Sequence, residues 1–379
     1  MKVLSGGVTA PEGFLANGLA CGIKRSGKRD LSLIFSQASA TAAGIFTINS
    51  IKAAPLEVTV KHLRNHRAQA VLINSGNANC FTGKFGMIYA QKSTELIAAL
   101  LNIKKTDVLV ASTGIIGKPL PYQKIAEAGS ALVRGLNRKG GRKAAEGMMT
   151  TDTFPKEIAV SLVIDGKKIV IGGCAKGSGM IEPNMATMLG FITTDAAVHP
   201  SALKKALQAA GEKTFNCISV DGCMSTNDMV TVMANGRAGN RPIGGSGKNF
   251  EKFSEALEYV CRELSQKIVL DGEGATKFIE ISVTGAKTDA QAKQAAKAVA
   301  NSNLVKTAAF GSNPNWGRVA AAVGSLGLNV TEKTLKIKFS PFDKKHIRID
   351  VNLPLGKGRA TVYTSDLSYE YVRINGAYN

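Results

Sequence analysis

One segment of this chain suggests a hydroxyl nucleophile that works without a histidine. In GGCAKGSGMIEPNMATMLGF, residues 172–191, a Gly/Ser loop carrying Lys176 leads through a Pro-Asn turn to Ala186 and Thr187. A hydroxyl nucleophile needs a base, and the α-amino group of an N-terminal threonine is one known solution. Its reference pKa of about 8 suits proton transfer near neutral pH. Thr187 would acquire such an amino group if the Ala186–Thr187 peptide bond were cut.

The neighbouring residues are compatible with self-cleavage at this bond. Glycine and alanine let backbone segments approach closely, so the Thr187 hydroxyl could attack the Ala186 carbonyl. The product would be an ester that water hydrolyses. A buried turn that enters a strand is the alternative interpretation, and the residue types alone leave both open.

Other catalytic motifs find no support in the sequence. The loop GGSGKN at 244–249 resembles a phosphate-binding loop, but Pro242 and Asn249 stand where Walker A requires Gly and Ser or Thr. No G-x-G-x-x-G, G-x-S-x-G or H-E-x-x-H occurs, and the four histidines lie away from the Gly-rich segments. The six cysteines include no C-x-x-C pair, so we expect reduced thiols and no metal site.

The charge balance is strongly basic, at a formal +20. This excess attracts anions and raises nucleic-acid binding as an alternative function. The basic residues form no run of five, however, and few aromatic residues are present to stack bases. No apolar run approaches the roughly 18 residues that span a membrane, and the N-terminus lacks a signal-peptide pattern, so we expect a cytoplasmic protein that binds neither membrane nor nucleic acid.

The elements that must position these residues are mixed. Helical periodicity predicts helices over 121–136 and 249–268, and a third that opens at Thr288, whose spacing to Gln291 suits a capping box. Val- and Ile-rich runs predict strands at about 69–74, 107–112, 158–164, 168–172, 278–284, 334–338, 346–352 and 360–364. Together with a length of 379 residues, this pattern predicts an α/β protein of layered mixed sheets flanked by helices. We expect a first domain at 1–285 and a smaller α/β domain at 286–379.

Several long segments, in order along almost the whole chain, resemble the ornithine acetyltransferase (glutamate N-acetyltransferase) family of arginine biosynthesis. They are GGVTAPEGF, IKAAPLEV, AVLINSGNANCFTG, VASTGIIG, MTTDTFPK, GCAKGSGMI, EPNMATMLGF, GEGATK, NSNLVKTAAFGSNPNWGR and YVRING. The resemblance implies a self-cleaving enzyme with a fold similar to, but distinct from, the N-terminal nucleophile hydrolases. It implies transfer of the acetyl group of N-acetylornithine to L-glutamate, no cofactor, and association of two α and two β fragments. It leaves open whether acetyl-CoA is a second acetyl donor.

The resemblance also implies roles for individual residues. Thr187 would be the N-terminal nucleophile after cleavage between Ala186 and Thr187. Thr113 and Gly114 would form an oxyanion hole, which both self-cleavage and acetyl transfer need for a developing negative oxygen.

Substrate binding is implied, besides Thr187, at four further positions, Thr150, Lys176, Glu273 and Asn375. Lys176 could pair with a carboxylate and Glu273 with an ammonium, as a site for α-amino acids requires. A self-processed aminopeptidase or amidase, in which water accepts the acyl group, is the competing enzymatic interpretation. GEGATK and NPNWGR favour the transferase.

Overall fold

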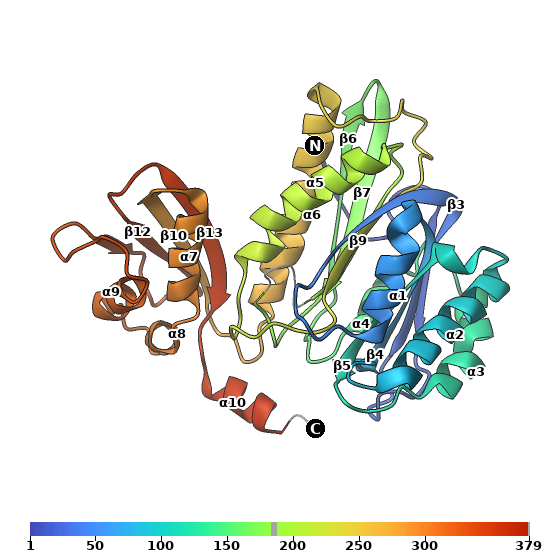
Figure 1. Ribbon diagram of the computed structural model, residues 1–379, viewed down its shortest axis with the longest axis horizontal. Helices are drawn as coiled ribbons and strands as arrows, with labels where there is room; N and C mark the ends of the chain where they lie inside the picture. Colours follow the sequence, from blue (N-terminus) through green and yellow to red (C-terminus); the bar gives the residue numbers. More distant parts are fainter. Residues whose placement is uncertain (183–187, 378–379) are drawn as a thin grey trace. The chain divides into compact units, whose positions relative to one another are not determined.

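The computed structural model describes residues 1–182 and 188–377 (Figure 1). The chain forms two compact units. The first contains the described residues of 1–177, 184–215 and 224–265, and the second those of 178–183, 216–223 and 266–379. Each unit has its own sheet and its own apolar core.

In the described part of the first unit, nine strands form one mixed sheet. They are β1 (Lys2–Leu4), β2 (Phe14–Leu19), β3 (Leu31–Phe46), β4 (Arg67–Asn77), β5 (Val108–Ile115), β6 (Lys156–Ile164), β7 (Lys167–Lys176), β8 (Leu189–Thr194) and β9 (Met229–Ala234). The order is β1-β6-β7-β8-β9-β3-β4-β5, with β2 paired to β3. The pairs β4–β5 and β8–β9 are parallel, and the other pairs are antiparallel.

Helices cover this sheet. They are α1 (Ala54–His62), α2 (Gly83–Leu101), α3 (Tyr122–Arg134), α4 (Gly141–Met148), α5 (Pro200–Lys213) and α6 (Lys248–Leu270), with short 3₁₀ turns at Leu63–Asn65, Lys105–Asp107 and Phe215–Cys217. The α1 and α2 helices lie beside β5, and α3 packs on α2 (Figure 1). The α4 helix packs on β2 and β3 so closely that a Cβ on Gly140 would lie 1.7 Å from the Ala16 carbonyl oxygen. Only glycine permits this approach.

The second unit is built on a four-stranded sheet in the order β11-β12-β10-β13. Its strands are β10 (Phe278–Ala286), β11 (Lys336–Phe339), β12 (His346–Asn352) and β13 (Gly358–Ser365), and its helices are α7 (Asp289–Ala300), α8 (Asn303–Phe310), α9 (Trp316–Gly324) and α10 (Tyr369–Gly376). The α7 helix lies on β10 and β13 (Figure 1). Alternate residues of β10 and β12, such as Ile281 and Ile349, are fully buried in the core of this unit.

The layered α/β architecture expected from the sequence is confirmed, and each strand and helix predicted above is present. The expected cap of α7 also forms, because the Gln291 N–H donates to the Thr288 hydroxyl over 3.1 Å. The expected domain boundary at residue 286 stays a prediction. It falls at the end of β10, whereas the second compact unit takes in all of β10, because this strand pairs with β12 on one side and β13 on the other.

Candidate active site

Thr113 and Gly114 lie at the carboxyl end of β5, where it runs parallel to β4. Gly114 is opposite Gly76 and has a φ of +128°. A Cβ on Gly114 would lie 2.4 Å from the Gly76 carbonyl carbon, so no other residue fits without a backbone shift. The Thr-Gly pair therefore holds a fixed backbone conformation near the end of the strand, and both residues are partly exposed.

Lys176 is the last residue of β7, and its ammonium reaches Thr113. Lys176 is 7% exposed, and its Nζ donates a hydrogen bond to Thr113 Oγ1 over 3.4 Å. Because the Thr113 oxygen accepts this bond, its own O–H can be aimed at another acceptor. A positive charge and a hydroxyl donor thus lie side by side, as stabilisation of an oxyanion requires.

Asp152 connects these groups to Thr150. One carboxylate oxygen accepts from Lys156 Nζ over 2.7 Å and from the Gly177 N–H over 2.8 Å, while the other accepts from the Thr150 N–H over 2.9 Å. The side chains of Asp152 and Lys156 are both fully buried. Burial raises the pKa of Asp152, but the charges of Lys156 and Lys176 and the hydrogen bonds from Lys156 and Gly177 outweigh burial, so the pKa lies below the ordinary value. The group is an anion that holds the backbone beside Lys176.

Lys24 is a further cation near this cluster. Its stem lies close to Gly76, since a Cβ on that glycine would be 3.0 Å from Lys24 Cγ. Its Nζ donates to the Arg29 carbonyl over 2.7 Å. Burial lowers the pKa of Lys24 to about 8, although the charges of Asp30 and Asp152 oppose the shift.

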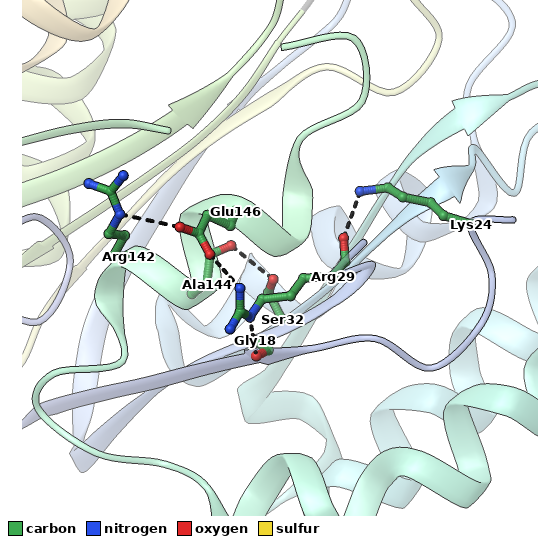
Figure 2. A network of polar contacts seen from close by, with 7 residues as sticks. All are labelled: Gly18, Lys24, Arg29, Ser32, Arg142, Ala144 and Glu146. Atoms are coloured by element: carbon green, nitrogen blue, oxygen red, sulfur yellow. Dashed lines mark hydrogen bonds and ion pairs between the residues drawn. The ribbon is translucent and has the colours of Figure 1, made fainter. Parts of the chain in front are cut away.

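The α4 helix, which ends two residues before Thr150, is anchored by polar contacts (Figure 2). Ser32 Oγ donates to the Ala144 carbonyl over 2.9 Å, and Glu146 forms ion pairs with Arg29 at 2.7 Å and Arg142 at 3.2 Å. The same Arg29 supplies the carbonyl that Lys24 binds, so one network ties the Lys24 loop to α4.

Glu273 and Asn375 belong to the second unit, and the structure brings them together. Asn375 Nδ2 on α10 donates to Glu273 Oε2 over 2.7 Å. Glu273 is 8% exposed, and its N–H donates to the Ser178 carbonyl over 3.0 Å. Its carboxylate lies against Gly179, because a Cβ there would be 2.2 Å from Glu273 Oε2. The arrangement presents a buried anion beside an amide.

The residues predicted from the sequence thus fall into three groups. Thr113, Gly114, Thr150 and Lys176 form one cluster in the first unit, and Glu273 and Asn375 form a contact in the second. Ala186 and Thr187 lie outside the described residues. Their assigned roles stay predictions.

Sequence reasoning missed Asp152, Lys156 and Lys24. The first two stand four residues apart in TTDTFPK, a segment from which only Thr150 was assigned. The signal in the sequence was an acidic and a basic residue four positions apart at the start of a buried strand. Lys24 lies in none of the segments that carry the family resemblance, and only its approach to Gly76 reveals it.

Two expected absences can be compared with the described residues. No group of three or more His, Cys, Asp or Glu side chains among them is arranged to hold a metal ion. None of the helices in residues 1–182 and 188–377 is both long and apolar enough to cross a membrane.

Known proteins resemble this chain over its full length. The model of the ArgJ family matches residues 15–343 and 340–379. The proteins called arginine biosynthesis bifunctional protein ArgJ from Caldanaerobacter subterraneus subsp. tengcongensis and Geobacter sulfurreducens are 46% and 45% identical, over 100% and 97% of this chain and 100% and 99% of theirs. A solved structure of ornithine acetyltransferase from Mycobacterium tuberculosis, complexed with ornithine, is 41% identical, covers 49% of this chain and 99% of that chain, and has a TM-score of 0.47. Since the family model and the relatives match nearly every residue, the chain belongs to the ArgJ family.

Proposed function

We propose that this chain is a self-cleaving acetyltransferase that moves the acetyl group of N-acetylornithine to L-glutamate. The observation that carries the proposal is the contact between Lys176 and Thr113 beside the constrained Gly114, at the carboxyl ends of β7 and β5. This contact supplies donors for an oxyanion. Membership in the ArgJ family supports the choice of substrates, since relatives are named as arginine biosynthesis proteins.

In the first step, the Thr187 hydroxyl attacks the Ala186 carbonyl, and the peptide nitrogen leaves as the new Thr187 amine. Water hydrolyses the resulting ester, which gives fragments of 186 and 379 − 186 = 193 residues. The Thr113 hydroxyl and the Gly114 region stabilise the negative oxygen of the tetrahedral intermediate.

In the transfer reaction, the Thr187 amine takes the hydroxyl proton while the oxygen attacks the acetyl carbonyl of N-acetylornithine. Ornithine leaves with that proton, and an acetyl-Thr187 ester remains. The amine of L-glutamate then attacks the ester, and the Thr187 hydroxyl is restored. No cofactor takes part in this scheme, and we propose acetyl-CoA as a second acetyl donor.

Two buried residues described above carry charges that suit the groups of these amino acids. Lys176 binds a substrate carboxylate, and the buried Glu273, held by Asn375, binds a substrate ammonium. Thr150 adds a polar contact. We further propose a cytoplasmic enzyme of two α and two β fragments.

The test of cleavage is the intact mass of the purified protein and of Thr187→Ala. The wild-type protein should give two fragments, the second beginning Thr-Met-Leu-Gly-Phe, whereas Thr187→Ala should give one uncut, inactive chain. Thr187→Ser keeps a hydroxyl and serves as the matched control that still cleaves. Cleavage of Thr187→Ala would show that a protease makes the cut.

The test of transfer is the kinetic pattern with both substrates. Ornithine leaves before glutamate binds, so double-reciprocal plots should give parallel lines, and the 193-residue fragment should carry an acetyl adduct of about 42 Da. Intersecting lines without an adduct would contradict a covalent role for Thr187.

A further inference from the structure

Asp221 opens the polar segment DGCMSTND, to which the proposed function assigns no role. We propose that Asp221 is a positioning residue for self-cleavage, which holds Met180 and Ile181, the residues that lead toward the Ala186–Thr187 bond. The inference rests on the self-cleavage proposed above. All the residues that carry it belong to the second unit.

The Asp221 carboxylate accepts hydrogen bonds from backbone N–H groups of the segment before the cleavage point. Its Oδ2 accepts from the Met180 N–H over 2.6 Å, and its Oδ1 accepts from the Ile181 N–H over 2.8 Å and the Cys223 N–H over 3.2 Å. Hydrogen bonds to an ionised acceptor are shorter and stronger than neutral ones. Two consecutive residues are therefore fixed by one side chain.

Met180 needs this support because its backbone is in the left-handed region. Its φ is +57°, which is unfavourable for a residue with a Cβ. Met180 is 44% exposed, so packing of its side chain contributes little to holding that conformation. The hydrogen bond from its own N–H to Asp221 stabilises the conformation directly.

The flanking backbone completes the attachment. The Val220 N–H donates to the Ile181 carbonyl over 2.7 Å, and the Glu182 N–H donates to the Cys223 carbonyl over 3.0 Å. Ile181 is fully buried, and the Glu182 carboxylate accepts from Asn301 Nδ2 over 2.6 Å. The chain is thus immobilised up to residue 182.

Holding residues 180–182 in place should favour the proposed self-cleavage. Ala186 is five positions after Ile181 in the sequence, which is at most about 18 Å in a fully extended chain. An anchor this close restricts the conformations open to the scissile bond, and a reaction within one chain is accelerated when the reacting groups are held in orientation.

The same carboxylate connects the segment to α10. The Tyr371 hydroxyl donates to Asp221 Oδ2 over 3.3 Å, and the Tyr371 carbonyl accepts from Asn375 Nδ2 over 3.0 Å. Burial and the Asp221 charge raise the pKa of Tyr371, which keeps this hydroxyl protonated as a donor. Asp221 therefore also stabilises the helix that carries Asn375.

The test compares Asp221→Asn with Asp366→Asn. The asparagine keeps the shape of Asp221 but replaces one acceptor oxygen with an NH₂ group facing N–H donors. Asp366 is a matched control in the same unit, because it is 3% exposed and accepts from the Thr276 N–H over 2.8 Å and the Lys277 N–H over 2.9 Å, with no hydrogen bond to residues 178–182 among those described. Cleavage is followed as loss of the 379-residue chain after a pulse of cell-free synthesis. Thermal stability is measured for each substitution separately, in the uncut Thr187→Ala protein.

Asp221→Asn should slow cleavage by about tenfold or more, as loss of charge-assisted bonds implies, whereas Asp366→Asn should stay within about twofold of wild type. Adding Met180→Gly to Asp221→Asn should recover part of the rate, because glycine adopts a positive φ readily. Three results would overturn the inference. The first is cleavage of Asp221→Asn at the wild-type rate, and the second is equal slowing by Asp366→Asn at an equal loss of thermal stability. The third is no recovery of the rate when Met180→Gly is added. Cleavage of Thr187→Ala would instead refute the proposed self-cleavage, on which this inference rests.

Discussion

At the scale of single residues, Gly114 is the most constrained position of the candidate site. Gly114→Ala should lower the free energy of unfolding by about 3 kcal/mol, because the new Cβ meets the Gly76 backbone at 2.4 Å and the φ is positive. It should also abolish most acetyl transfer, since Thr113 would move with the strand end. Chemical denaturation and steady-state kinetics measure the two effects.

The control for this substitution lies three residues further along the chain. Gly117 also has a positive φ, +82°, but a Cβ there would meet no atom within 4 Å. Gly117→Ala should therefore lower the free energy of unfolding by only about 1 kcal/mol, which is the cost of a positive φ without a clash, and should retain activity. Equal losses at both positions would show that the clash with Gly76 has no part in the effect.

At the scale of elements, Asp152 fastens the start of β6 to the end of β7 through Lys156 and Gly177. Asp152→Asn removes the carboxylate charge 2.7 Å from the buried Lys156 ammonium and should lower the free energy of unfolding at pH 7 by about 3–5 kcal/mol. The folded-state pKa of Asp152 lies below its unfolded value of about 3.9. The stabilisation that the Asp152 carboxylate gives to the folded state is thus complete above about pH 4, and it is lost as the pH falls through the lower folded-state pKa.

Denaturation at several pH values tests this prediction. The difference between wild type and Asp152→Asn should hold from pH 7 to about pH 4 and shrink below it. Glu95→Gln is the control, because Glu95 pairs with Lys105 at the surface, where the side chains are 51% and 62% exposed, and such pairs contribute about 1 kcal/mol or less. A difference that does not depend on pH below 4 would contradict the assigned charge.

At the scale of the whole molecule, both predicted fragments contribute to one sheet. The β8 strand, which follows the cleavage point, pairs with β7 before it, and β9 pairs with β3. All six residues of β8 are buried. Separation would expose this apolar surface to water, so the cut fragments should stay associated.

Gel filtration of the cut protein and of uncut Thr187→Ala measures this association. Both should elute at the same volume, and the fragments should part only in denaturant. Independent elution of the 186- and 193-residue fragments under native conditions would contradict the shared sheet.

Local sequence determined the elements whose side chains repeat regularly. The buried stripe of α6, the alternation of β12 and the Thr288 cap of α7 follow from short-range rules, and each was predicted. The strands β3 and β9 were not, although each pairs with two or more neighbours. Half of the 16 residues of β3 are Ala, Ser or Gly, which have weak strand propensity, and pairing with β2, β4 and β9 keeps this stretch extended.

Motifs along nearly the whole chain also identify the family, and with it the candidate nucleophile Thr187. Which side chains meet depends on how the chain folds. The contact of Thr113 with Lys176 joins residues 63 apart, and that of Met180 with Asp221 joins residues 41 apart. Such contacts depend on strand order and on the close approach that glycines permit, and neither follows from local propensity, because both result from the packing of distant segments.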